Sequence, residues 1–222
     1  MRVLGELRKI GFHVRLQTVR RYRKNVPRDP SSNWRTFLDN HRAEMWASDF
    51  FTVHTLWFQT LYVFFFIADD RRTVMHVNVT THPTAPWAWR QLIEATPWGS
   101  GPRYLIRDRD RCYGGDFVAR AKGIGIRTVL TPIATPQANG ITERLVGTFR
   151  RECLDHIVIV NERHLRRVLR EFVGHYNGAR PHQALELQVP EPRAGSPPAT
   201  AGHIISRPVL GGLTHEYERA AA

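Results

Sequence analysis

The stretch MWASDFFTVHTLWFQTLYVFFFIADDRRTVMHVNVT, residues 45–80, decides the fold class. Its β-branched and aromatic residues fall into three runs, at 45–53, 60–69 and 72–80, with short breaks between them. Runs of this kind are typical of consecutive strands, so we expect three strands that pair antiparallel to one another. The most apolar part, residues 56–68, is shorter than the roughly 20 apolar residues that cross a bilayer, which indicates a protein core.

The chain beyond these strands alternates between helical and strand patterns. The expected elements are a helix at APWAWRQLIEAT (85–96), a strand at RYLIRD (103–108), a helix at GGDFVARAKGIG (114–125), a strand at IRTVLTP (126–132), a helix from Glu143, and a last helix at NERHLRRVLREFVGHYN (161–177). In the last helix Asn161 is the expected N-cap, and the expected buried stripe is Leu165, Val168, Leu169, Phe172 and Val173. The order β-β-β-α-β-α-β-α-α predicts an α/β fold, a mixed five-stranded sheet flanked by helices on both faces.

Three segments are expected along the chain. Residues 1–33 form a helical arm and a Pro/Ser linker; the arm resembles the second half of a helix-turn-helix, although a plain basic arm stays open. Residues 34–189 form the globular core. Residues 190–222 form a Pro-rich linker and a small tail, in which residues 203–222 are expected to make a hairpin.

The chain is strongly basic, with a formal net charge of +12 and a pI of about 10.7. Nearly all of the positive charge is arginine, because lysine occurs only at Lys9, Lys24 and Lys122. Guanidinium groups suit phosphate oxygens, so the composition favours nucleic acid as a partner over a basic protein without one, which stays open as the alternative. Cys112 and Cys153 make no disulfide or zinc pattern, and residues 1–15 lack a signal segment, so we expect a cytoplasmic protein without a membrane anchor.

Three carboxylates occupy notable positions: Asp49 inside the first strand, Asp108 at the end of a later strand, and Glu143 at the start of a helix. Each alone has an ordinary explanation, as an ion pair, a turn residue or a partner of the helix dipole. A lone carboxylate buried in a strand nevertheless costs several kcal/mol unless it is paired, solvated or bound to metal. Together the three can converge at one edge of the sheet, where their repulsion favours divalent cations such as Mg²⁺ or Mn²⁺.

The spacing of these residues, with Glu143 35 positions after Asp108, resembles the DD(35)E signature of retroviral integrases and bacterial insertion-sequence transposases. The local sequence is similar too, in WASDFF (46–51), IRDRD (106–110), TPQANGITER (135–144), RRECLD (150–155) and HYNGARPHQAL (175–185). The resemblance covers about residues 34–190 and implies an RNase H-like fold, with an integrase catalytic core at 34–189.

The resemblance also implies metal-dependent DNA cleavage and strand transfer. Water would cut a phosphodiester at an element end, and the freed 3′ hydroxyl would attack target DNA. Two Mg²⁺ or Mn²⁺ ions would serve as cofactors, with Asp49 bridging both, and Asp108 and Glu143 each holding one. The implied partners are element-end DNA, target DNA and further copies of the chain. The alternatives are an inert or truncated transposase remnant that only binds DNA, and an RNase H-like nuclease that cuts without joining.

Several arginines are candidates for DNA contact. They are Arg144, Arg150 and Arg151 after Glu143, and Arg20 and Arg21 in the helical arm. The loop TPQANG (135–140) is expected to approach a phosphate backbone closely. For these arginines, and for the basic face of the last helix (Arg163, Arg166, Arg167 and Arg170), a merely solvated surface is the alternative.

Two features depart from the family pattern. Many relatives carry glycine two residues after the second aspartate, where this chain has Asp110, which competes with Asp108 for a metal. The N-terminal arm is also shorter than the DNA-binding domain of relatives. HYNGARPHQAL is expected to be structural, with Tyr176 and Leu185 packing and Pro181 ending a helix, while DNA contact by Arg180 or His182 stays open.

Overall fold

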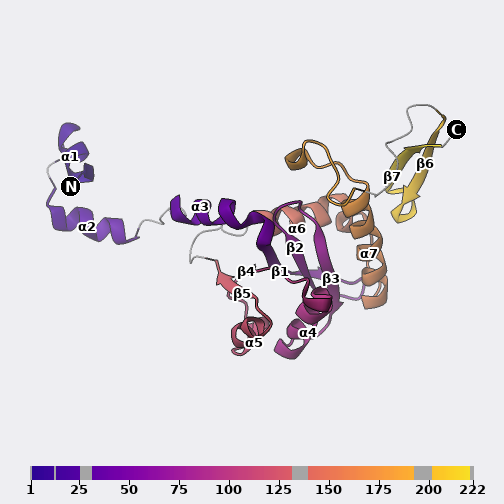
Figure 1. Ribbon diagram of the computed structural model, residues 1–222. Helices are drawn as coiled ribbons and strands as arrows, with labels where there is room; N and C mark the ends of the chain where they lie inside the picture. Colours follow the sequence, from indigo (N-terminus) through magenta and orange to yellow (C-terminus); the bar gives the residue numbers. More distant parts are fainter. Residues whose placement is uncertain (1, 13, 26–31, 132–139, 193–201, 221–222) are drawn as a thin grey trace.

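The computed structural model describes residues 2–12, 14–25, 32–131, 140–192 and 202–220, and a five-stranded sheet lies at its centre (Figure 1). The strands are β1 (Met45–His54), β2 (Thr60–Ala68), β3 (Val74–Thr80), β4 (Tyr104–Arg107) and β5 (Arg127–Leu130), in the order β3-β2-β1-β4-β5. The first three strands pair antiparallel, whereas β4 pairs parallel with β1 and β5 pairs parallel with β4. The expected mixed sheet with three consecutive antiparallel strands is therefore confirmed.

Strand β2 is buried on both faces, which explains its almost unbroken apolar sequence. Successive side chains of a strand point to opposite faces, so Val63 and Phe65 pack in one core, and Phe64 and Phe66 pack in the other. Helices α6 (Gly140–Glu152) and α7 (Glu162–Gly178) cover the first face, and α4 (Ala85–Ala95) and α5 (Phe117–Gly123) cover the second (Figure 1).

Local signals in the sequence define the ends of these helices. The Thr84 side chain accepts a hydrogen bond from the backbone N–H of Trp87, and Pro86 lies in the first turn of α4. The Asn161 side chain accepts from the backbone N–H of His164, which confirms the expected N-cap of α7. The expected apolar stripe of α7 packs on the sheet, with Leu165, Val168, Leu169 and Phe172 buried and Val173 partly buried.

The N-terminal segment has two helices, α1 (Arg2–Lys9) and α2 (Leu16–Asn25), with Gly11 at φ +87° in the turn between them, as expected. A further helix, α3 (Ser32–His41), begins inside the stretch that was expected to be linker. It is part of the core, because the Phe37 ring lies edge-on to the Tyr104 ring with 5.2 Å between centroids.

The C-terminal segment forms the expected hairpin, in which β6 (Ile204–Val209) and β7 (Thr214–Arg219) pair antiparallel. The hairpin lies beside α7 (Figure 1). Two polar contacts hold it there: the Leu210 backbone N–H donates to the Glu171 carboxylate, and His175 Nδ1 lies 3.1 Å from Glu216 Oε1.

None of the helices in the described ranges is both long and apolar enough to cross a membrane.

Candidate active site

Asp49 lies in the middle of β1, on the sheet face that α6 and α7 cover. Its Oδ1 accepts a hydrogen bond from the Phe50 backbone N–H at 2.8 Å, and its Oδ2 accepts one from the Thr142 hydroxyl at 3.0 Å. Burial raises the pKa of Asp49 to about 6; the charges of Asp108 and Glu143 also raise it, and the two hydrogen bonds lower it. The strand thus presents a carboxylate whose ionised form is destabilised by burial and by two other carboxylates.

Asp108 directly follows β4, next to Asp49. Strands β4 and β1 pair in parallel, with Ala47 opposite Ile106. Asp49 and Asp108 each come two residues later in the chain, so they lie on the same face and at the same edge of the sheet. Burial raises the pKa of Asp108, and the nearby charge of Asp110 adds to that rise. The parallel register therefore brings the first two predicted carboxylates together.

Asp110 has a structural role in the turn after β4. Its Oδ1 accepts a hydrogen bond from the Cys112 backbone N–H at 2.7 Å, which caps the 3-10 helix Arg111–Tyr113. Its own backbone N–H donates to Asp108 Oδ1 at 3.2 Å. These bonds favour Asp108 over Asp110 as the second carboxylate of the site.

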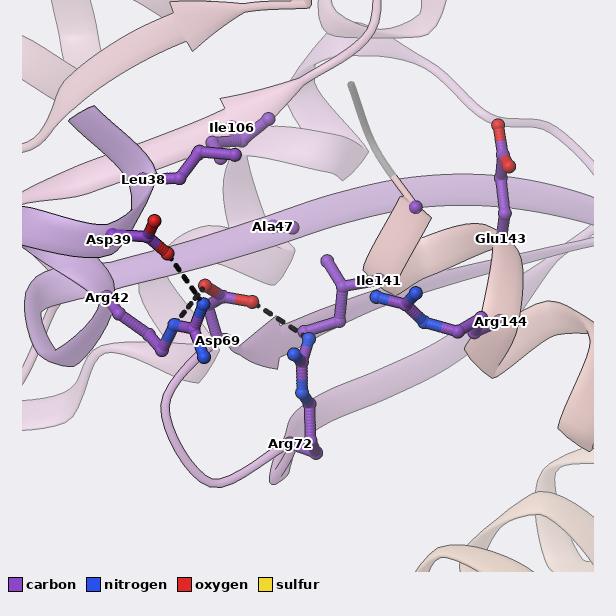
Figure 2. Close-up of a pocket in the computed structure, with 11 residues that line it drawn as sticks. Leu38, Asp39, Arg42, Ala47, Asp69, Arg72, Ile106, Ile141, Glu143 and Arg144 are labelled. Atoms are coloured by element: carbon purple, nitrogen blue, oxygen red, sulfur yellow. Dashed lines mark hydrogen bonds and ion pairs between the residues drawn. The ribbon is translucent and has the colours of Figure 1, made fainter. Parts of the chain in front are cut away.

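Glu143 lies in the first turn of α6 and is exposed. Its charge acts on Asp49, yet Figure 2 shows its side chain turned away from the guanidinium groups of Arg72 and Arg144. Across the described ranges, no three His, Cys, Asp or Glu side chains are already gathered around a point that suits a metal ion. The structure therefore brings Asp49 and Asp108 together and leaves Glu143 at the rim.

A buried pair of hydroxyl groups lies beneath the two aspartates. Ser48 Oγ and Tyr113 Oη are 2.9 Å apart, and both side chains are almost wholly buried. This contact ties β1 to the turn that follows Asp108, and the charges of Asp108 and Asp49 act on the Tyr113 hydroxyl. The pair was not predicted, because serine and tyrosine 65 residues apart give no local signal.

Arg107, the last residue of β4, also contacts the residues around Asp108. It is buried, with its guanidinium carbon 4.6 Å from the Tyr113 ring centroid and 5.6 Å from that of Phe117. Its Nη1 donates to the backbone carbonyl of Asp108 at 3.1 Å. Burial lowers the pKa of Arg107, while the neighbouring charge of Asp108 raises it. Arg107 therefore fixes the backbone that carries the second carboxylate.

The arginines predicted to contact DNA differ in their surroundings. Arg144 is exposed, whereas Arg150 donates to the Thr52 carbonyl at 3.1 Å and so lies along β1. Arg151 is also exposed, and its guanidinium lies over Gly147. Arg20 and Arg21 belong to α2, but their side chains lie outside the described part of the structure, as does most of the TPQANG loop.

On α7 the basic face divides into two kinds of residue. Arg163, Arg167 and Arg170 are exposed, as expected for either a solvated face or a DNA contact. Arg166 instead donates one hydrogen bond to the Val79 carbonyl and another, of 2.6 Å, to the Glu162 carboxylate. The first of these bonds links α7 to β3. Arg166 therefore has a structural role that the sequence did not indicate.

The HYNGARPHQAL segment holds the two helices of one face together. The Arg180 guanidinium makes two hydrogen bonds of 2.6 Å to the carboxylate of Glu152, at the end of α6. Tyr176 is buried and the His182 ring lies edge-on to it at 4.5 Å, while Asn177 bonds both backbone groups of Val74. The expected structural role of this segment is confirmed for Tyr176. Arg180 and His182 have a structural role as well.

Comparisons with known proteins show similarity in sequence and in fold. Residues 124–190 match the family described as Integrase core domain. Two insertion element IS136 uncharacterized proteins, from Agrobacterium fabrum and Agrobacterium tumefaciens, are each 29% identical over 82 residues, which is 35% of this chain and 42% of each relative. A chain of the simian T-cell lymphotropic virus intasome, solved in complex with PP2A regulatory subunit B56 gamma, matches with a TM-score of 0.55 at 14% identity, covering 80% of this chain and 67% of that chain. The resemblance stated from the sequence and the RNase H-like fold are therefore confirmed.

Proposed function

We propose that this chain, which carries an integrase core of the insertion-sequence type, is the part of a DDE transposase that cuts DNA strands and joins them to a target. The observation that carries the proposal is the register of β1 and β4, which sets Asp49 beside Asp108, with Glu143 in the first turn of the adjoining helix. The proximity of the two aspartates supports the proposal, together with the spacing of all three residues in the sequence.

The three carboxylates have the chemistry of a divalent metal site. Hard oxygen ligands suit Mg²⁺ or Mn²⁺. A cation would offset the burial of the Asp49 charge and its repulsion by Asp108 and Glu143, which together raise the pKa of Asp49. Asp49, Asp108 and Glu143 would hold these ions. Such ions supply charge stabilisation to the attacking and leaving oxygens of an in-line phosphoryl transfer.

The chain's other residues support a DNA substrate. The net charge of +12 attracts a polyanion, and Arg144 and Arg151 are exposed on the helix that carries Glu143. Arg150, Arg20 and Arg21 are the further candidates for phosphate contact. In this scheme the chain is cytoplasmic and associates with the nucleoid through DNA. It assembles as a homo-oligomer on element ends, because joining two ends requires two active sites.

A plasmid assay tests the proposal. Supercoiled plasmid and end-labelled duplex DNA are incubated with the wild-type chain or with Glu143→Gln, in Mg²⁺ or Mn²⁺, and with EDTA as the blank. We expect nicked and joined products only from the wild type with metal. The control variant is Arg90→Gln, which changes an exposed arginine on α4, on the opposite face of the sheet.

The products separate the alternatives. Nicks without joined strands indicate an RNase H-like nuclease, and DNA binding without any cutting indicates an inert remnant. Equal products from wild type and Glu143→Gln would overturn the assignment of Glu143.

A further inference from the structure

A pocket of about 570 Å³ opens beside Glu143. Helix α3, the start of β1, the turn between β2 and β3, and the first turn of α6 form its walls (Figure 2). Three arginines line it: Arg42 from the 3-10 helix Arg42–Glu44 that follows α3, Arg72 from the turn, and Arg144 from α6. None of the predicted site residues except Glu143 and Arg144 belongs to this pocket, and Arg42 and Arg72 lie far from them in the sequence.

Two of the three arginines are held in place by ion pairs. Arg72 Nη1 lies 2.9 Å from Asp69 Oδ1, and Arg42 Nη2 lies 2.9 Å from Asp39 Oδ1. Arg42 Nε also approaches Asp69 Oδ2 at 3.6 Å. These pairs balance the charges of Arg42 and Arg72 and fix their positions on the pocket wall (Figure 2).

Arg144 differs, because its guanidinium makes no hydrogen bond or ion pair with the described residues. Figure 2 shows its side chain extending across the pocket on the side of Ile141 and Arg72. Burial lowers the pKa of Arg72, and the positive charges of Arg144 and Arg42 lower it further against the opposing effect of Asp69. Two guanidinium groups therefore repel each other across an open pocket.

The backbone at Arg72 gives a second indication that this wall is specialised. Arg72 has φ +61°, in the left-handed region that residues with a Cβ rarely adopt. Such a conformation is strained and persists where the surrounding contacts enforce it. Here it directs a long basic side chain to Asp69 and the pocket, which a glycine at this turn would not do.

We propose that the pocket binds a phosphate of the DNA backbone between Arg72 and Arg144. This rests on the proposed function, which supplies DNA as the source of the phosphate. Guanidinium forks bind phosphate oxygens in pairs, and an anion between the two groups replaces their repulsion with attraction. Since Arg144 directly follows Glu143, the bound phosphate lies near the bond to be cut, and the pocket sets the position of the strand at the carboxylates.

DNA binding without catalysis tests this site. The affinity of a fluorescent duplex is measured over a range of salt concentrations in EDTA, with every variant built on Glu143→Gln. The variants are Arg144→Gln, Arg72→Lys, which keeps a cation for Asp69, and the double change. Arg90→Gln is the control for loss of one exposed positive charge.

Arg144→Gln is expected to weaken binding about tenfold and to reduce the slope of log K against log salt by about one. Arg72→Lys is expected to weaken binding about threefold, and the double variant to be little weaker than Arg144→Gln, because both side chains hold the same phosphate. Arg90→Gln should leave the affinity within about twofold of the parent.

Two outcomes overturn the proposal, and they are distinct. If both pocket variants bind as the parent does, with unchanged salt slopes, while the wild type still cuts plasmid, the pocket proposal fails and the proposed function stands. If the wild type neither binds nor cuts DNA, the proposed function fails, and the pocket proposal with it.

Discussion

Replacing Asp49 by asparagine is expected to stabilise the metal-free protein at pH 8. In the fold, burial and the charges of Asp108 and Glu143 raise the Asp49 pKa from 3.8 to about 6. This difference corresponds to about 3 kcal/mol, since each whole step in pKa is 1.36 kcal/mol. Asp49 retains some contact with solvent, which reduces the expected gain to about 2 kcal/mol. Asparagine fits the same space, and the Thr142 hydroxyl can accept from its amide.

The sign of this effect depends on pH. Because the folded protein binds the Asp49 proton more tightly than the unfolded chain does, ionised Asp49 destabilises the fold at any pH above about 6. The cost decreases between pH 6 and 3.8 and is absent below that window. The advantage of Asp49→Asn is therefore expected in full at pH 8 and should be nearly lost at pH 4.

Urea unfolding in EDTA, at pH 8, 6 and 4, measures the difference in the free energy of unfolding. Asp155→Asn serves as the control, because Asp155 is exposed on the short turn after α6. A variant that is no more stable than wild type at pH 8 would refute the reasoning. So would a gain that is the same at pH 4 as at pH 8, since it could not come from the Asp49 charge.

Three further outcomes follow from the site and its supports. Adding Mg²⁺ at about 100 times its Kd should raise the free energy of unfolding of the wild type by about 2.7 kcal/mol in urea titrations, and that of Asp49→Asn far less. Thr142→Val, which removes the hydroxyl bonded to Asp49, should lower the cleavage rate at least tenfold while Thr142→Ser stays near wild type; equal rates for the two would exclude a positioning role. Arg180→Gln should cost about 1–3 kcal/mol of stability by leaving Glu152 without its paired donor, whereas Arg170→Gln, at an exposed position on α7, should change it by less than about 0.5 kcal/mol in the same titration.

The sheet and its helices were predictable because their signals are local. Strand alternation, the Asn161 cap and the apolar stripe of α7 each depend on residues within a few positions of one another. Helix α3 escaped prediction because its sequence, SNWRTFLDNH, gives only a weak helical stripe. It is stabilised by contacts with the core, where Phe37 meets Tyr104.

The candidate site likewise contains residues that the sequence indicated and residues that only the fold revealed. The sequence supplied Asp49, Asp108 and Glu143 through their spacing, but the parallel register of β1 and β4 was needed to show that the two aspartates are neighbours. Their supports, the Ser48–Tyr113 contact and the Thr142 hydroxyl, join residues 65 and 93 positions apart. Pairs at such separations carry no periodic signal. Serine and threonine are also too common in any chain for their presence to single out such a pair.

The sequence by itself thus determined the strands, the helices other than α3, the basic charge and the three carboxylates. The charge depends on composition, the strands and helices on patterns repeated over a few residues, and the carboxylates on a spacing that resembles a family's. Only the tertiary structure decided which side chains share a space: Arg180 with Glu152, and Arg42 and Arg72 with Arg144 at one pocket. The physical reason is that hydrogen bonds and charge interactions depend on distance in space, which the folded backbone sets.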